Sequence, residues 1–151
     1  MDKQYISWDD VFHICDVNVE RFKFMDFTDI IAIARGGLMP AQLIAHQLGI
    51  RRVHSLGITF YEKDNPEGMR KIPITYQLLT SNLENARVLV VDEIADSGAT
   101  FIHAINYLHI INPSLTFKTF AMYYKGCSVY TPDYIGKTVP SEKWLQMPYE
   151  V

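Results

Sequence analysis

Cysteine, excess basic charge and long hydrophobic runs are all scarce in this chain of 151 residues. Its two cysteines, Cys15 and Cys127, are far apart and belong to no CxxC motif, so we expect reduced thiols rather than a disulfide framework or a cysteine-based metal site. No apolar run approaches the roughly 20 residues of a membrane-spanning helix. No basic segment followed by an apolar one marks a secretion signal near the N-terminus. These absences predict a cytoplasmic protein without an integral membrane segment.

The balance of charge excludes one class of partner. The chain has 14 Lys and Arg against 17 Asp and Glu, a formal net charge of −3, and both signs are spread along it. A protein that holds nucleic acid by bulk electrostatics needs a basic run or patch that neutralises many phosphates. The five histidines have neither HxxxH nor HxH spacing, which argues against a histidine metal site. We therefore expect no nucleic-acid partner, although a small local anion site is compatible with this composition.

Length and hydrophobicity predict one globular domain over residues 1–151, because 48% of the chain is hydrophobic and no repeat or linker marks a boundary. Predicted strands alternate with predicted helices, which indicates an α/β fold with a mostly parallel twisted sheet flanked by helices. Pro132, Pro140 and Pro148 favour a short irregular C-terminal tail. Hydrophobic periodicity places helices at about 8–23, 40–48 and 99–111, and strands at 29–34, 52–61, 73–79, 87–91 and 115–124.

Local signals mark some of the element ends. Ser7 with Asp10 three residues later resembles a capping box at the start of the first helix. Pro40 suits the first turn of the second helix, and Gly49 suits its C-terminal cap. The charged segment 62–71 contains Asn-Pro and Glu-Gly, which is typical of a turn or a mobile loop.

The most informative stretch is VLVVDEIADSGATF at residues 88–101, where a buried-looking strand runs into three acids and then small residues. The segment 96–100 stands between a strand and a helix, where the first N–H groups of the helix lack intrahelical partners and attract anions. Ser97 and Thr100 add hydroxyl donors, and Gly98 lets the backbone approach an anion closely. The pattern predicts a phosphate-binding loop that lacks the GK[ST] of a nucleotide-triphosphatase P-loop.

The acidic half of this stretch needs another explanation, because Asp92, Glu93 and Asp96 would repel a bare phosphate. Carboxylates accept hydrogen bonds from ribose hydroxyls, and their oxygens are ligands for Mg²⁺. The two halves together suit a sugar phosphate with a metal-bound anionic substituent. The plainer alternative, an Asp helix cap with solvated acids at a strand end, stays open on these residues alone. Phosphoacceptor receiver domains also carry an acidic pair at a strand end, but without such a phosphate cradle after it.

The stretch resembles the phosphoribosyl-pyrophosphate (PRPP) signature of the type I phosphoribosyltransferases, an apolar strand, two acids, a spacer and then Asp-Thr/Ser-Gly-x-Thr. Glu93 stands where Asp is commoner, and Ser97 where Thr is usual. The segments YISWDDV, IARGGLMPAQLIAHQLGI, MYYK and PSEKWLQMPYE are similar to the purine branch, the xanthine-guanine and hypoxanthine-guanine enzymes. Tyr149 stands where these enzymes often carry Trp.

The resemblance implies an enzyme of purine salvage. Ribose 5-phosphate would pass from PRPP to a 6-oxopurine (guanine, xanthine or hypoxanthine), pyrophosphate would leave, and Mg²⁺ would be the cofactor. The transition state has oxocarbenium character at ribose C1, so the site must hold the pyrophosphate and place the base in line. Related enzymes are dimers or tetramers, and we expect a homodimer or a homotetramer here.

The resemblance also assigns residues to PRPP. Pyrophosphate is expected at Arg35 and Gly36 of the RGGL segment. The segment 62–71 corresponds to a flexible loop that closes over PRPP, and Arg70 is its expected pyrophosphate contact, with Lys71 and Lys63 as alternatives. An ordinary mobile hairpin tip is the other interpretation of this segment. Closure would exclude water from the activated ribose. The residues expected at the 5′-phosphate and the ribose are Asp92, Glu93, Asp96, Ser97, Gly98, Ala99 and Thr100, of which Asp92 and Glu93 would also hold Mg²⁺.

For the purine, the resemblance points to both halves of the chain. Asp96 would exchange a proton with purine N7 as a general acid or base. Lys125, at a strand end, would donate to the oxygen at position 6. Trp144 would stack on the ring, and backbone groups of Trp144 and Leu145 would read position 2. Taken alone, a strand-end lysine is more often solvated and a lone tryptophan more often belongs to the core.

Two rival functions follow from the same residues. A protein of this fold could sense PRPP or a nucleotide without useful turnover, as a regulator. Retention of Asp96, Lys125 and a candidate lid favours the enzyme. A pyrimidine or orotate acceptor is the third reading, and the short chain and the Lys125 and Trp144 segments argue against it.

Overall fold

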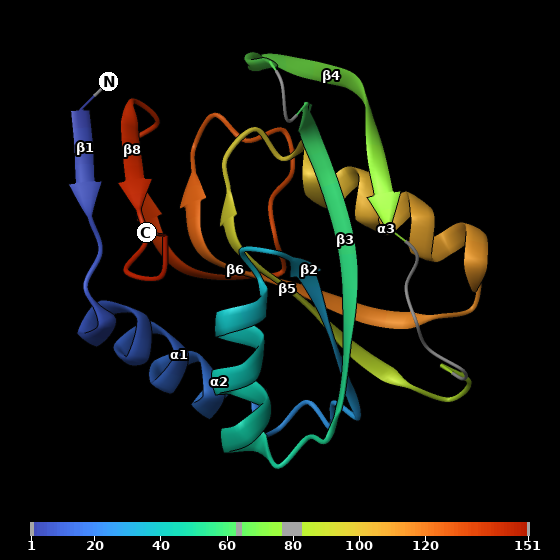
Figure 1. The fold of residues 1–151 in the computed structure, drawn as a ribbon. Helices are drawn as coiled ribbons and strands as arrows, with labels where there is room; N and C mark the ends of the chain where they lie inside the picture. Colours follow the sequence, from blue (N-terminus) through green and yellow to red (C-terminus); the bar gives the residue numbers. More distant parts are fainter. Residues whose placement is uncertain (1, 63–64, 77–82, 151) are drawn as a thin grey trace.

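The structure, a computed structural model, describes residues 2–62, 65–76 and 83–150. Helices α1 (Trp8–Phe22) and α2 (Leu38–Leu48) cover one face of its main sheet and α3 (Ala99–Ile111) covers the other (Figure 1). The sheet consists of β2 (Asp29–Ala34), β3 (Arg52–Glu62), β4 (Asn65–Tyr76), β5 (Arg87–Ala95), β6 (Thr116–Lys125) and β7 (Tyr134–Val139). Its order is β4-β3-β2-β5-β6-β7, and among the described residues of this sheet only β3 and β4 pair antiparallel. The predicted α/β fold with a mostly parallel sheet is confirmed.

Strand β2 shows why its sequence is a continuous apolar run. Successive side chains of a strand point to opposite faces. Ile30 and Ala32 belong to the hydrophobic cluster beneath α1 and α2, whereas Ile31 and Ile33 belong to the cluster beneath α3. Each face of a central parallel strand is thus buried by a different helical layer.

The predicted element ends are largely confirmed. The Ser7 hydroxyl accepts the Asp10 N–H at 3.1 Å, and the Ser7 N–H donates to Asp10 Oδ2 at 3.0 Å, which completes the capping box of α1. Helix α2 begins at Leu38, two residues before the expected start, so Pro40 still occupies its first turn. Gly49 ends α2 with φ of +68°, a left-handed conformation that glycine adopts without a Cβ clash.

The prediction of a turn or mobile loop at 62–71 is wrong for most of that segment. Strand β3 continues to Glu62 and β4 begins at Asn65, with Glu62 opposite Asn65 in an antiparallel hairpin. Pairing with the edge of the sheet outweighs the local composition, and an edge strand tolerates Pro66 and Pro73 because one side of its backbone carries no ladder hydrogen bonds. The strand expected at 73–79 is the end of β4, and residues 77–82 lie outside the described part.

The tail is less irregular than predicted. It contains β7 and a further strand, β8 (Lys143–Gln146), which pairs in parallel with an unpredicted N-terminal strand, β1 (Asp2–Tyr5). The three prolines of the tail lie outside these strands. They flank the strands and do not prevent them. Pairing across 141 residues leaves no local signal, so the sequence does not predict β1 and β8.

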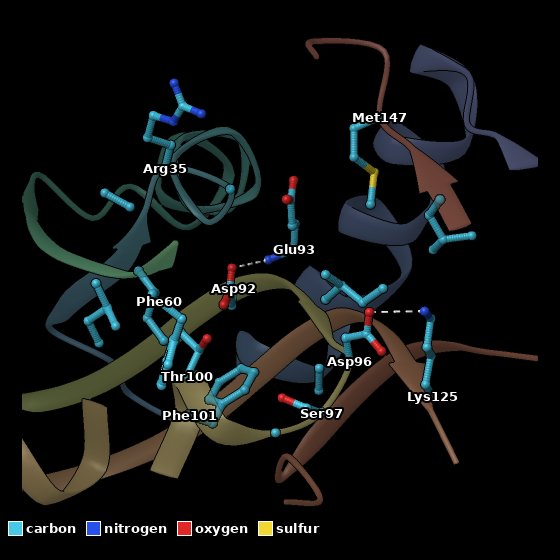
Figure 2. A pocket seen from close by; sticks show the side chains of 18 of the residues that line it. Arg35, Phe60, Asp92, Glu93, Asp96, Ser97, Thr100, Phe101, Lys125 and Met147 are labelled. Carbon is cyan, nitrogen blue, oxygen red and sulfur yellow. Dashed lines mark hydrogen bonds and ion pairs between the residues drawn. The ribbon is translucent and has the colours of Figure 1, made fainter. Parts of the chain in front are cut away.

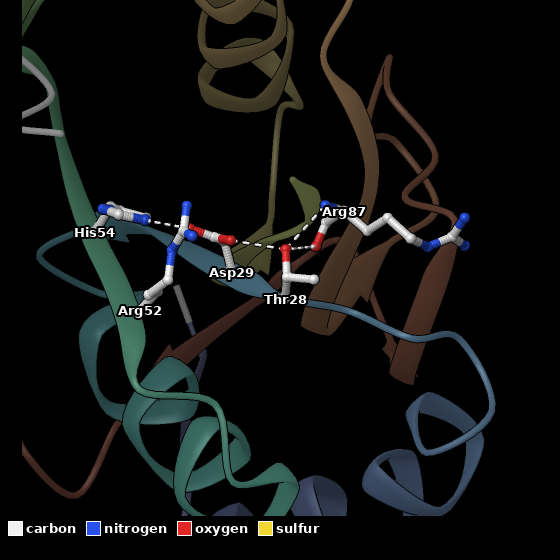
Figure 3. A network of polar contacts seen from close by, with 5 residues as sticks. All are labelled: Thr28, Asp29, Arg52, His54 and Arg87. Carbon is white, nitrogen blue, oxygen red and sulfur yellow. Dashed lines mark hydrogen bonds and ion pairs between the residues drawn. The ribbon is translucent and has the colours of Figure 1, made fainter. Parts of the chain in front are cut away.

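A buried carboxylate, Asp29, lies at the opposite end of β2 from the predicted ligand loops (Figure 3). Its Oδ2 accepts from Arg52 Nε at 2.9 Å and is hydrogen-bonded to His54 Nε2 at 2.7 Å. Thr28 Oγ1 donates to Oδ1 at 2.7 Å. Burial raises the pKa of Asp29, but the hydrogen bonds from His54 and Thr28 and the charge of Arg52 outweigh it, so its pKa lies below its ordinary value.

Asp29→Asn is expected to lower the free energy of unfolding at pH 7 by about 1–3 kcal/mol, because it weakens a buried hydrogen-bonded pair. A carboxyl whose pKa is lowered by folding stabilises the protein above its unfolded pKa of about 3.9 and loses this contribution as the pH falls through the folded pKa. In urea unfolding, the difference in the free energy of unfolding between the wild type and the variant should therefore shrink as the pH falls from 5 to 2. Asp2→Asn, in an exposed ion pair with Lys143, is the control, and a pH-independent difference for Asp29→Asn would contradict the argument.

Candidate active site

A cavity of about 450 Å³ lies at the carboxyl ends of the parallel strands, where open α/β sheets bind their ligands. Its wall includes the β2–α2 loop, the ends of β5 and β6, the start of α3 and the tail (Figure 2). The predicted residues that line it are Arg35, Gly36, Asp92, Glu93, Asp96, Ser97, Gly98, Thr100, Lys125, Trp144 and Leu145.

Two predicted residues are not placed there. Ala99 begins α3 and is absent from the cavity wall. The backbone of Arg70 is part of β4, but its side chain, like those of residues 61–72 generally, lies outside the described part of the structure. The pyrophosphate contact assigned to Arg70 and the closing of segment 62–71 therefore stay predictions.

Strand β5 is longer than expected and carries the acidic pair. It runs to Ala95, four residues beyond the predicted 87–91, and β6 pairs with the extension, with Asp92 opposite Ala121 and Ile94 opposite Tyr123. Asp92 and Glu93 therefore lie on a strand of the central sheet instead of a loop. Backbone pairing outweighs the low strand propensity of acidic residues, and the carboxylates gain a rigid support.

Asp92 is a buried acid, with 8% of its surface exposed. Burial, with a smaller contribution from the Glu93 charge, raises the pKa of Asp92 well above its ordinary value, although the Glu93 N–H donates to Oδ1 at 2.8 Å. Its charged form is costly in the absence of a cation. A cation bound beside this carboxylate would offset that cost.

Glu93 lies between the RGGL loop and the tail (Figure 2). Burial raises its pKa above the ordinary value, and a hydrogen bond from the Tyr149 hydroxyl to Oε2, 2.8 Å long, opposes that effect. An ideal Cβ on Gly36 would lie 2.4 Å from Oε1. A side chain at position 36 would therefore have to displace the Glu93 carboxylate, a constraint that the RGGL sequence alone does not reveal.

The short loop between β5 and α3 has the form expected of an anion cradle. Gly98 is the N-cap of α3 with φ of +86°, and an ideal Cβ there would lie 2.6 Å from Ser128 Oγ and from the Tyr130 backbone nitrogen. The loop is thus packed from behind and only glycine fits. The Ser97 hydroxyl accepts the Ala99 N–H at 3.3 Å, and the free N–H groups at the start of α3 provide donors for an anion.

Lys125 and Asp96 meet at the cavity wall (Figure 2). Lys125, with 3% of its surface exposed, ends β6, and its Nζ donates to Asp96 Oδ2 at 3.0 Å. The Asp96 side chain is 52% exposed, so a buried ammonium is paired with a carboxylate that faces the cavity rim. The pair presents a hydrogen-bond donor and an acceptor side by side.

The tail forms the wall facing this pair. Trp144 is 46% exposed, so it is a surface of the cavity and no core residue, and the neighbouring Leu145 is buried. Both belong to β8, whose register places Trp144 opposite Lys3 and Leu145 opposite Gln4. The β1–β8 pair therefore fixes the position of the aromatic ring.

Several side chains of the site were not predicted. Phe60, Phe101, Met147 and Glu150 line the cavity, and Tyr149 contacts Glu93. Phe60 lies at the carboxyl end of the strand predicted at 52–61, a position that marks it as a candidate. The other four contacts depend on how the tail and α3 fold over β5, for which the sequence carries no local signal.

Among the described residues, no group of three or more His, Cys, Asp or Glu side chains is arranged to hold a metal ion. Any ion beside Asp92 and Glu93 would need further ligands from a substrate or from water. In the described part of the chain, the helices are also too short or too polar to cross a membrane.

Comparison with known proteins places this geometry in context. The model of the phosphoribosyl transferase domain matches residues 24–150. A purine phosphoribosyltransferase from Pyrococcus horikoshii Ot3 is 27% identical, with a TM-score of 0.86 over 100% of this chain and 96% of that one.

Two more distant structures share the fold. The Helicobacter pylori xanthine-guanine-hypoxanthine phosphoribosyltransferase is 19% identical with a TM-score of 0.83, over 99% of this chain and 94% of that one. A hypothetical protein from Neisseria gonorrhoeae with bound ppGpp is 22% identical with a TM-score of 0.78, over 99% and 90%. At these identities the likeness shows the fold alone.

Proposed function

Because the chain belongs to the phosphoribosyltransferase family, we propose that it is a purine salvage enzyme that transfers ribose 5-phosphate from PRPP to a 6-oxopurine and releases pyrophosphate. One observation carries this proposal. The buried Lys125, paired with Asp96, opens on the same cavity as the acidic pair and the anion cradle. A base site and a sugar-phosphate site thus share one space.

The Lys125–Asp96 pair matches one edge of a 6-oxopurine. Such a base presents an acceptor, O6, beside a donor, N7–H, and Lys125 Nζ and the Asp96 carboxylate supply the complementary donor and acceptor. Adenine presents an amino group at position 6, which would face the ammonium donor to donor. An unmatched buried polar group costs about 1–3 kcal/mol, so we infer a preference for guanine, xanthine or hypoxanthine. Trp144, half-exposed and part of the cavity wall, would offer a stacking surface.

PRPP would occupy the rest of the cavity. The 5′-phosphate fits the start of α3, where Ser97 and Thr100 add hydroxyls beside the N–H groups. Arg35 would neutralise pyrophosphate charge, and Asp92 and Glu93 would accept from the ribose hydroxyls. These assignments place C1 of the ribose between the acidic pair and the base.

The residues present fit a Mg²⁺ ion. Mg²⁺ is commonly held by one or two carboxylates, with substrate phosphates and water completing its shell, and Asp92 and Glu93 provide two carboxylates on the cavity wall. Bound there with PRPP, Mg²⁺ would neutralise the pyrophosphate leaving group.

The protein groups act mainly by positioning and by charge. Arg35 and the α3 terminus hold the two anionic ends of PRPP, and Trp144 and Lys125 orient the base toward C1. As the new bond forms at C1, Asp96 takes up the proton at N7. The half-exposed Asp96 side chain can then pass that proton to solvent.

A nucleotide-sensing regulator is the second candidate. The Neisseria protein of the same fold was solved with bound ppGpp, and the cradle and acidic pair of this chain would suit a phosphorylated nucleoside without any turnover. Catalysis separates the two candidates, because a sensor does not need to exchange a proton with a base at Asp96.

The test is to incubate pure protein with PRPP, Mg²⁺ and, separately, guanine, xanthine, hypoxanthine and adenine, and to assay nucleotide and pyrophosphate. We expect product with at least one 6-oxopurine, little with adenine, and none when Mg²⁺ is chelated. No product from any base would overturn the enzyme in favour of the sensor. Adenine as the best acceptor would overturn the role of Lys125.

A further inference from the structure

Tyr149 links the C-terminal tail to the acidic pair on β5. Its hydroxyl donates to Glu93 Oε2 at 2.8 Å, across 56 residues of sequence. Its ring lies against Trp8 of α1, with centroids 5.8 Å apart and planes at 52°, and Trp8 stacks in turn on Phe12. The packing of α1 therefore fixes the ring, and the ring fixes where the hydroxyl can donate.

The Glu93 carboxylate is oriented from both sides. Oε2 is held by Tyr149, and Oε1 faces Gly36, where even a single Cβ would come within 2.4 Å. Glu93 thus presents one oxygen to the RGGL loop while the other is occupied. A flexible side chain that is already ordered loses less entropy when it binds a ligand.

We propose that Tyr149 is a positioning residue that holds Glu93 ready for Mg²⁺–PRPP. The tail that carries Trp144, the residue proposed to stack on the base, then also sets the affinity for PRPP. The inference rests on the proposed function. Tyr149 acts through Glu93 and touches no substrate itself. Trp144 lies five positions before Tyr149 in the same tail, and Met147, between them in sequence, also lines the cavity (Figure 2).

The decisive variant is Tyr149→Phe, which keeps the ring against Trp8 and removes only the hydroxyl. By calorimetry we expect its Kd for Mg²⁺–PRPP to rise about three- to tenfold, the range that corresponds to the net contribution of one hydrogen bond. The KM for PRPP should rise with it, while kcat and the KM for the base stay unchanged, as expected when ground-state binding alone is lost. The matched control is Tyr5→Phe, at a tyrosine that is 75% exposed on β1.

A double-mutant cycle tests whether the effect passes through Glu93. In a Glu93→Gln background, Tyr149→Phe should weaken Mg²⁺–PRPP binding less than it does in the wild type, because the two residues form one unit. Arg35 and the start of α3 remain in that background to bind the phosphates. An additive loss would overturn the proposal, as would a Tyr149→Phe protein with the wild-type Kd.

A general loss of structure is a different outcome and also overturns the proposal. It would lower the melting temperature of Tyr149→Phe and weaken the base and PRPP alike. A wild-type protein that binds no Mg²⁺–PRPP would overturn the proposed function and the inference together. A wild type that binds it, with an unaltered Tyr149→Phe variant, overturns the inference alone.

Discussion

Asp96→Asn is expected to lower kcat with the preferred purine about 10²- to 10⁴-fold, the usual contribution of a positioned general acid or base. Asparagine has nearly the same shape as aspartate. In the wild type, Lys125 Nζ lies 3.0 Å from Asp96 Oδ2, and the amide oxygen of the variant can still accept this hydrogen bond. The base site therefore keeps its form while the group that takes the N7 proton is gone. Steady-state kinetics with saturating PRPP and Mg²⁺ measure the effect, and the KM values should change much less than kcat.

The control for this variant is Asp2→Asn. Asp2 also pairs with a lysine, Lys143, but on the exposed β1–β8 pair, where loss of an ion pair has little effect on stability. Its kcat should equal that of the wild type. If Asp96→Asn turned over like the wild type, Asp96 would have no part in proton transfer.

The second large effect concerns the choice of base. Lys125→Met should reduce kcat/KM for 6-oxopurines about 10- to 150-fold, which is the 1.5–3 kcal/mol of a hydrogen bond to a charged donor. Activity with adenine should not fall, so the discrimination between the two classes of base collapses. Methionine retains most of the apolar stem of this buried side chain, and the half-exposed Asp96 left behind can be solvated. Kinetics with hypoxanthine and adenine, run side by side, give the ratio.

Lys118→Met is the matched control, because Lys118 lies on the same strand in an ion pair with Asp133, with its side chain 49% exposed. It should change neither activity nor discrimination. An equal fall for hypoxanthine and adenine in Lys125→Met would mean that Lys125 supports the structure of the cavity and does not read position 6.

The central part of the fold was predictable because its signals are local. The run at 29–34 is apolar on both faces, and the capping box at Ser7 and the glycine at 49 mark helix ends. The hairpin of β3 with β4 and the β1–β8 pair were not predictable in this way. Both depend on backbone pairing with another segment of the chain. This pairing outweighs the local charge and proline content, which by themselves favour loops.

The residues of the candidate site also fall into two groups, those with a local sequence signal and those that depend on contacts between distant segments. The acidic pair and the cradle are contiguous in sequence, so their chemistry could be read directly as that of a metal-associated sugar phosphate. Lys125 and Trp144 were named through family resemblance, because nothing nearby in sequence distinguishes them. The contacts from Lys125 to Asp96 and from Tyr149 to Glu93 join residues 29 and 56 positions apart. Such contacts exist only once the sheet has brought the two segments together.

The pairing of β1 with β8 has a consequence for the order in which the cavity can form. Its ends lie 141 residues apart, at Asp2 and Lys143, so closing this loop early in folding would cost more chain entropy than any neighbouring βα contact. Contacts of this separation become favourable after local elements have assembled. The phosphate cradle belongs to a local strand–helix unit. The position of Trp144 on the cavity wall depends instead on the β1–β8 pair, whose two strands lie far apart in the sequence. The half of the cavity that would hold the sugar phosphate can therefore exist in a partly folded chain before the half that would hold the base.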